Sequence, residues 1–133
     1  MQVKAINGLH WQFDIRKFAD VKLSNDDRHQ VVGQRHPEPF PGLMCVLVVL
    51  KETGRDRFFV LEWKELRDIL VQVHEAYLAK HGGIRPKKPD SFHCSLRIED
   101  VERFENQWFK IRDRVAKNTA QQCAASESKQ PAS

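Results

Sequence analysis

Eight consecutive apolar residues, at positions 43–50, constrain the fold of this chain more than any other feature. Three of the eight are valines, whose β-branched side chains favour strands. The run is too short to span a bilayer and too uniformly apolar for a strand with one solvated face. We therefore expect a central strand that is buried on both faces and is covered by other elements.

The composition indicates one globular domain. The chain has 133 residues, of which 41% are hydrophobic and 30% are charged, and this balance argues against wholesale disorder and against a membrane span. Its three cysteines, Cys45, Cys94 and Cys123, are an odd number without CxxC spacing, which argues against a disulfide framework and a zinc ribbon. No signal peptide is recognisable at the N-terminus, so we expect a cytoplasmic protein.

The charge and the C-terminal composition divide the chain into a body and a tail. Residues 118–133 contain no large hydrophobic side chain, so we predict a single domain over residues 1–117 and a disordered tail over residues 118–133. The net charge of +4 belongs to the body. An excess of this size is compatible with DNA binding but is also common in proteins that bind no nucleic acid.

The first 33 residues predict two β-hairpins. The dipeptide Asn7-Gly8 separates residues 2–6 from residues 9–15, and Asn-Gly is a strong hairpin signal because both turn positions need positive φ. In that register Gln2 and Lys4 share a face with two aromatic side chains, Trp11 and Phe13, and Asp14 points away from it. A second, weaker hairpin is predicted over residues 18–33.

The rest of the pattern predicts an α+β or α/β fold. Residues 58–62 should return antiparallel to the central strand, residues 64–81 form an amphipathic helix, and Gly82-Gly83 ends it. A strand over residues 92–98 and one or two helical turns within residues 99–114 follow. We expect one mixed, mostly antiparallel sheet, covered by a long helix and a short C-terminal helix.

The triplet Gln2-Val3-Lys4 is the first candidate site. Residues two apart on a strand point the same way, so Gln2 could offer an amide oxygen to a metal ion and Lys4 an ammonium to a phosphate or an attacking water. Aromatic neighbours would partly desolvate Lys4 and shift its pKa. A lysine close to a chain end is usually solvated, so the spacing alone does not establish a site.

Several sequence blocks carry a resemblance to known proteins. In order they are QVKAINGLHWQFDI, GLMCVLVVL, DRFFVLEWKEL, YLAKHGGIRPKKPDSFHC and ERFENQW, within residues 1–112. They are similar to the C-terminal two thirds of small uncharacterised bacterial proteins that resemble the restriction-endonuclease-like PD-(D/E)xK nuclease superfamily. The resemblance implies a truncated restriction-endonuclease-like fold with a magnesium-dependent phosphodiesterase motif. Gln2 and Lys4 match its QxK strand by position, as catalytic residues, with Gln2 also a metal ligand.

The chain departs from that superfamily in one respect. The strand with the metal-binding Asp, and a helix with a further acidic residue, precede the motif in the superfamily, and this chain begins at the motif itself. Mg²⁺ sites usually rely on one or two carboxylates, so we expect an incomplete active site that does not cleave. Two alternatives are a magnesium-dependent DNA endonuclease whose upstream segment is missing, and a homo-oligomeric binding module that pairs through an exposed strand edge near residues 1–5.

Two further groups of residues could carry chemistry. His74 and His81 lie on one side of the predicted helix, and His93 and Cys94 are adjacent on a strand. Adjacent strand residues point to opposite faces, so this spacing is poor for a zinc site. Cys45 and Cys94 are better explained as small core residues. The loop after the helix could contact a DNA backbone, although a merely solvated loop has the same composition. Its candidate nucleic-acid-binding residues are Lys80, Arg85, Lys87 and Lys88.

Overall fold

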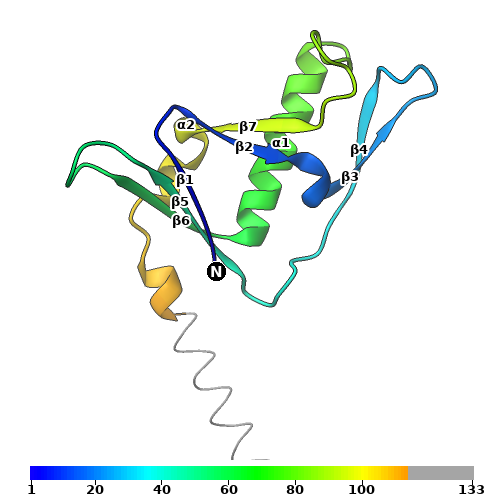
Figure 1. Cartoon of the computed structure of the whole chain (residues 1–133). Coiled ribbons are helices and arrows are strands. Elements are labelled where there is room, and N and C mark those ends of the chain that lie inside the picture. The colour runs from blue at the N-terminus through cyan, green and yellow to red at the C-terminus, as the bar shows by residue number, and fades with distance from the viewer. Residues whose placement is uncertain (114–133) are drawn as a thin grey trace, which may run out of the picture.

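The computed structural model describes residues 1–113, so the predicted tail over residues 118–133 lies outside the described residues. Figure 1 shows one long helix, α1, against short strands. None of the described helices is long and apolar enough to cross a membrane. The elements in order are β1 (Gln2–Ile6), β2 (His10–Asp14), η1 (Ile15–Lys17), β3 (Ala19–Leu23), β4 (Gln30–Arg35), β5 (Met44–Val49), β6 (Arg57–Glu62), α1 (Trp63–Lys80), β7 (His93–Arg97), α2 (Ile98–Val101) and η2 (Glu102–Phe104).

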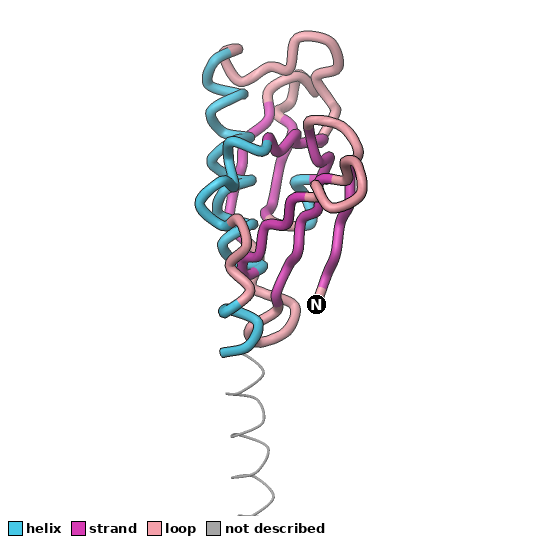
Figure 2. The backbone as a smooth tube through the Cα atoms, turned by 90° about the vertical axis from the view of Figure 1, so that its left-hand side faces the viewer, coloured by secondary structure: helices cyan, strands magenta, loops and turns pink. Residues whose placement is uncertain are grey.

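The strands form three small sheets where we had predicted one. The first has the order β1-β5-β6, with β1 parallel and β6 antiparallel to β5. The others are the antiparallel pairs β2-β7 and β3-β4. The molecule is therefore mixed α+β with mostly antiparallel sheets, a long helix and short helices, as predicted. Figure 2 shows α1 on one side of the molecule and the strands on the other.

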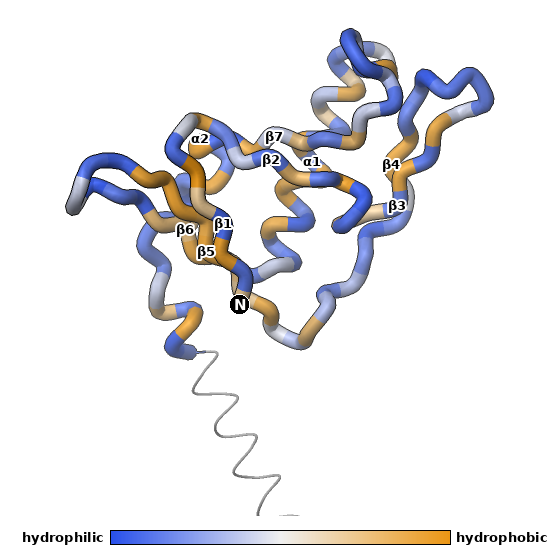
Figure 3. The backbone as a smooth tube through the Cα atoms, viewed as in Figure 1, coloured by the Kyte–Doolittle hydropathy of each residue, from blue (hydrophilic) through white to orange (hydrophobic). Residues whose placement is uncertain are grey.

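The buried central strand is confirmed as β5. Its residues are each at most 6% exposed, and alternate side chains enter two clusters. Cys45, Leu47 and Val49 belong to the main core with α1, whereas the other three pack with Val60 on the opposite face. Hydrophobic residues accordingly concentrate along β5 and β6 in Figure 3.

The hairpin predicted at Asn7-Gly8 is wrong. β1 pairs in parallel with β5, and β2 pairs with β7, so the two strands beside the dipeptide are not partners. A strand buried on both faces needs a partner along each edge, and β6 covers only one edge of β5. Burial of Trp11, which is 0% exposed, likewise commits β2 to the core. Pairing and burial outweigh the turn preference of two residues.

The remaining elements agree with the prediction to within a few residues. β3 and β4 form the second hairpin, β6 returns antiparallel to β5, and β7 lies within the predicted strand. Helix α1 ends where expected, because Gly82 and Gly83 adopt φ of 65° and 86°. The N–H of Gly83 donates to the carbonyl of Leu78 at 2.7 Å, which satisfies one of the last helical carbonyls.

Candidate functional site

Gln2 and Lys4 line one cleft of about 520 Å³, between β1, the end of β2, η1 and the start of α1. They lie two apart on β1, where alternate residues share a face, and Val3 between them lines the cleft as well. The cleft is largely apolar in its depth, where it is lined by Cys45, Leu47, Phe18, Trp63 and Leu66. Two lysines, Lys4 and Lys17, therefore border a cleft that has an apolar floor.

The environment of Lys4 is the one expected for a partly desolvated lysine. Its Nζ donates a hydrogen bond to the carbonyl of Gln12 and lies 4.2 Å from the ring centroid of Phe13. Burial lowers the pKa of Lys4, and the charge of Lys17 lowers that pKa further. Trp11, which we had also predicted beside Lys4, instead packs against Phe59 with ring centroids 5.7 Å apart.

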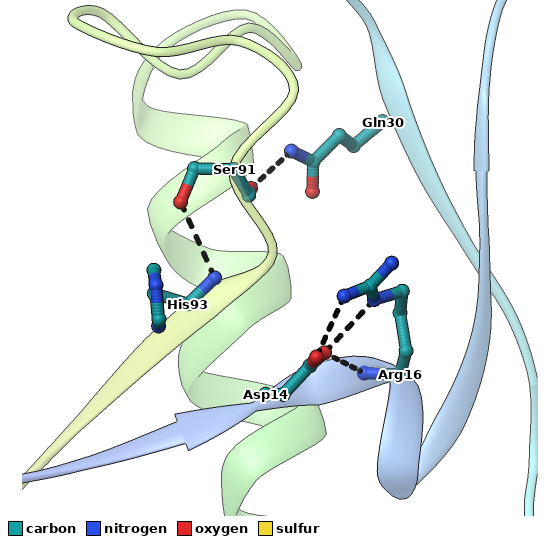
Figure 4. A network of polar contacts seen from close by, with 5 residues as sticks. All are labelled: Asp14, Arg16, Gln30, Ser91 and His93. Atoms are coloured by element: carbon teal, nitrogen blue, oxygen red, sulfur yellow. Dashed lines mark hydrogen bonds and ion pairs between the residues drawn. The ribbon is translucent and has the colours of Figure 1, made fainter.

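Asp14 lines the same cleft, although the predicted register turned it away. That prediction depended on a hairpin that does not form. Both carboxylate oxygens are occupied by Arg16: Nε lies 3.0 Å from Oδ1 and Nη2 lies 2.7 Å from Oδ2 (Figure 4). The backbone N–H of Arg16 donates to Oδ1 as well, at 3.0 Å. These hydrogen bonds from Arg16 lower the pKa of Asp14, so the carboxylate is ionised and already paired.

The predicted metal role of Gln2 has little support from its neighbours. Asp14 is the one carboxylate among the described residues that line the cleft, and it is bound to Arg16. Over residues 1–113 there is no group of three His, Cys, Asp or Glu side chains that could hold a metal ion. The cleft thus presents ammonium and amide groups, which suit an anion better than a cation.

The histidines of α1 do not converge. His74 is 1% exposed, and its Nε2 lies 3.0 Å from Oε1 of Gln30. The Gln30 amide is oriented by its own donation from Nε2 to the carbonyl of Pro89 at 2.8 Å and to that of Ser91 at 2.6 Å. Figure 4 shows the bond to Ser91. Oε1 of Gln30 must therefore accept from Nε2–H of His74, so Nε2 carries the proton when the ring is neutral. Burial lowers the pKa of His74 to about 4.

His81 lies at the C-terminal cap of α1, with its ring centroid 4.7 Å from that of Tyr77. The thiols are core groups, as predicted: Cys45 and Cys94 are buried, and burial raises their pKa to about 11 and about 12. His93 is exposed on the opposite face of β7 from Cys94. The third cysteine, Cys123, lies outside the described residues.

Gln30 is the buried polar residue that sequence reasoning missed. It is 5% exposed, and it joins β4 to α1 and to the loop before β7. Nothing in its local sequence distinguishes it from the exposed polar residues of the same hairpin. Its role depends on contacts with residues more than forty positions away, at His74 and Ser91.

The four candidate nucleic-acid-binding residues, in and before the loop that follows α1, have different environments in the structure. Arg85 is half-buried, donates from Nη1 to the carbonyl of His93, and lies over the Tyr77 ring at 5.4 Å. Lys80 is exposed at the end of α1, whereas Lys87 and Lys88 are exposed in the loop. Within the described part of the chain, these four side chains form no ion pair. Arg85 and Lys80 line cavities beside α1 and β7, and Lys87 and Lys88 are not among the described lining residues of these cavities.

No protein-family model, curated protein sequence or solved structure matched the chain. Its function must therefore be inferred from its own side chains.

Proposed function

We propose that this chain is a DNA-binding domain of restriction-endonuclease-like ancestry that holds a backbone phosphate in the Gln2 and Lys4 cleft without cleaving it. The pairing of Asp14 with Arg16 carries the proposal. It removes the cleft's carboxylate from metal binding, while Lys4 and Lys17 remain as cations beside it. Mg²⁺ is usually held in proteins by one or two carboxylates, whereas a phosphate is held by ammonium and N–H groups.

The apolar floor strengthens this interaction. Burial in this cleft reduces the solvation of the Lys4 ammonium, and charges attract more strongly where water is excluded. The amide of Gln2 can donate to the same anion. The lowered pKa of Lys4 shows that the folded protein disfavours its charge, so a bound phosphate would relieve that cost.

The test is the affinity for a fluorescein-labelled DNA duplex, measured by anisotropy across a salt series. The double variant Lys4→Ala/Lys17→Ala should bind about tenfold more weakly at low salt, and the slope of log K against log salt should fall by about 0.9 for each phosphate that the variant no longer neutralises. Lys51→Ala is the matched control, because Lys51 is an exposed cation just beyond the opposite end of β5. Its affinity should equal that of the wild type.

Two results would contradict this function. Unchanged duplex affinity in the double variant would remove the cleft from DNA binding. Cleavage of plasmid DNA with Mg²⁺ or Mn²⁺ that is abolished by Lys4→Ala would instead establish the alternative, a magnesium-dependent endonuclease. In that case Asp14 would have to release Arg16 to reach the metal ion.

A specific observation also favours self-association. β1 is the end strand of its sheet, with no ladder partner on its outer edge within residues 1–113, and Val3 is 61% exposed there. An exposed edge of this kind can pair with a second copy of the chain. We expect the wild type to sediment as a homodimer at high concentration and Val3→Lys to sediment as a monomer.

Val31→Lys is the matched control for that experiment, because Val31 is also 61% exposed but lies on β4. It should leave the oligomeric state unchanged. A wild type that remains monomeric at high concentration would exclude pairing through β1.

A further inference from the structure

Two cavities adjoin between the C-terminal half of α1 and β7, away from the Gln2 and Lys4 cleft. The deeper one, of about 170 Å³, contains His74 and Arg85 in its lining, and the wider one, of about 570 Å³, extends to Lys80 and Arg97. Both are lined by Val73, Tyr77 and Ser95, so they adjoin at these residues. We call the two cavities together the α1-β7 groove.

Arg85 is an oriented cation with unused donors. Its Nη1 donates to the carbonyl of His93, and its guanidinium lies 5.4 Å from the centroid of the Tyr77 ring. A guanidinium has five N–H donors, so these contacts fix its direction and leave most of the donors available. No acidic side chain of residues 1–113 pairs with Arg85. The deeper cavity is therefore suited to a phosphate group.

The wider cavity adds a second cation without an ion pair, because Lys80 lines it. His10 and Arg97 line it as well. Asp100 is the one acidic side chain among the described lining residues, and Arg97 pairs with it at 3.5 Å. The exposed Lys87 and Lys88 follow Arg85 in the chain. Among the described lining residues, the groove thus offers two cations without an ion pair, Arg85 and Lys80, which fits a ligand with more than one phosphate.

Tyr77 stands where the two cavities meet, and it is 40% exposed. An exposed aromatic ring among cations is the combination with which proteins bind unpaired bases and the backbone that joins them. Bases of a duplex are stacked on one another and paired, so they do not offer a free face to this ring, whereas unpaired bases do.

We propose that the α1-β7 groove binds single-stranded DNA, with a phosphate at Arg85 and a base against Tyr77. The choice of DNA over RNA rests on the function proposed above. The site itself does not, because it shares no residue with the Gln2 and Lys4 cleft. The chain would then contact DNA through two separate surfaces.

The test is the affinity of the full chain for a fluorescein-labelled oligothymidylate of about 12 nucleotides, measured by anisotropy over a salt series. Arg85→Gln should weaken binding about tenfold and lower the salt slope by about 0.7, the value for one phosphate of a single strand. Tyr77→Leu keeps an apolar side chain but loses the ring, and it should weaken binding about tenfold with little change in slope.

Lys64→Gln is the matched control, because Lys64 is an exposed lysine of the same helix, about 24 Å along the axis from Lys80. Its affinity should stay within about twofold of the wild type. Circular dichroism spectra and thermal midpoints identify variants that remain folded. For each groove position a second substitution, Arg85→Lys or Tyr77→Phe, should restore most of the affinity, which a general loss of folding would not permit.

Three results would overturn the proposal. The first is wild-type affinity in folded Arg85→Gln and Tyr77→Leu. The second is loss of binding in Arg85→Gln but not in Tyr77→Leu, which would make the groove a general polyanion site. The third is a tighter complex with oligouridylate, which would assign the groove to RNA. If Lys4→Ala/Lys17→Ala loses duplex binding while the groove variants keep single-strand binding, the proposal for the cleft is supported and the proposal for the groove is overturned. If the groove variants lose single-strand binding while Lys4→Ala/Lys17→Ala keeps duplex binding, the groove is supported and the cleft is overturned.

Discussion

Replacing Trp11 with alanine is expected to lower the free energy of unfolding by about 3–5 kcal/mol. Trp11 is 0% exposed, lies at the centre of the main core, and packs edge-on against Phe59. Its ring joins the β2-β7 pair to the β5-β6 pair, because Phe59 belongs to β6. The substitution therefore removes packing between two sheets, and nearby loops cannot close the cavity.

Urea denaturation followed by circular dichroism measures this effect. Trp11→Phe should cost less than Trp11→Ala, because it keeps a ring and removes the indole Nε1, which is buried without a hydrogen-bond partner within residues 1–113. Trp108→Ala is the control, since Trp108 is 41% exposed and should cost about 1 kcal/mol or less. Equal losses at positions 11 and 108 would show that Trp11 does not join the sheets as described.

A second large effect is a loss of stability at mildly acidic pH that depends on His74. Its folded pKa of about 4 lies below the ordinary value of 6.5 because burial disfavours the charged ring, and the charge of Arg85 adds to this effect. As the pH falls from 6.5 to 4, the imidazole of His74 becomes protonated in the unfolded chain but stays largely neutral in the native state. Stability should therefore decrease over this window, by about 3 kcal/mol at pH 4.

A comparison of the wild type with His74→Gln isolates this contribution, because other groups titrate nearby. His36 acts in the opposite direction: Asp20 raises its pKa, so its stabilisation is present at acidic pH and is lost as the pH rises through that raised pKa. Carboxylates with lowered pKa, such as Asp26, lose their contribution only at lower pH. Urea titrations at several pH values should show a steeper decline in the wild type. Parallel curves would mean that His74 is not held neutral.

The candidate site was predictable only in part. Gln2 and Lys4 share a face because of the two-residue period of a strand, which holds whatever the strand pairs with. The side on which Asp14 lies was predicted wrongly, because that prediction needed the partner of β2. The arrangement of Arg85 over Tyr77 and the bond of Gln30 to His74 join residues distant in sequence, and no local pattern signals them.

Local sequence patterns were enough to recognise most of the strands and the long helix. The apolar run that forms β5, the helical spacing in α1 and the glycines after it act over a few residues, so they can be identified without knowing the fold. The pairing of the strands, in contrast, depends on contacts between distant segments. β1 joins β5 in parallel and leaves Asn7-Gly8 as a link between sheets. It does so because burying the edge of β5 and the side chain of Trp11 gains more free energy than a two-residue turn provides.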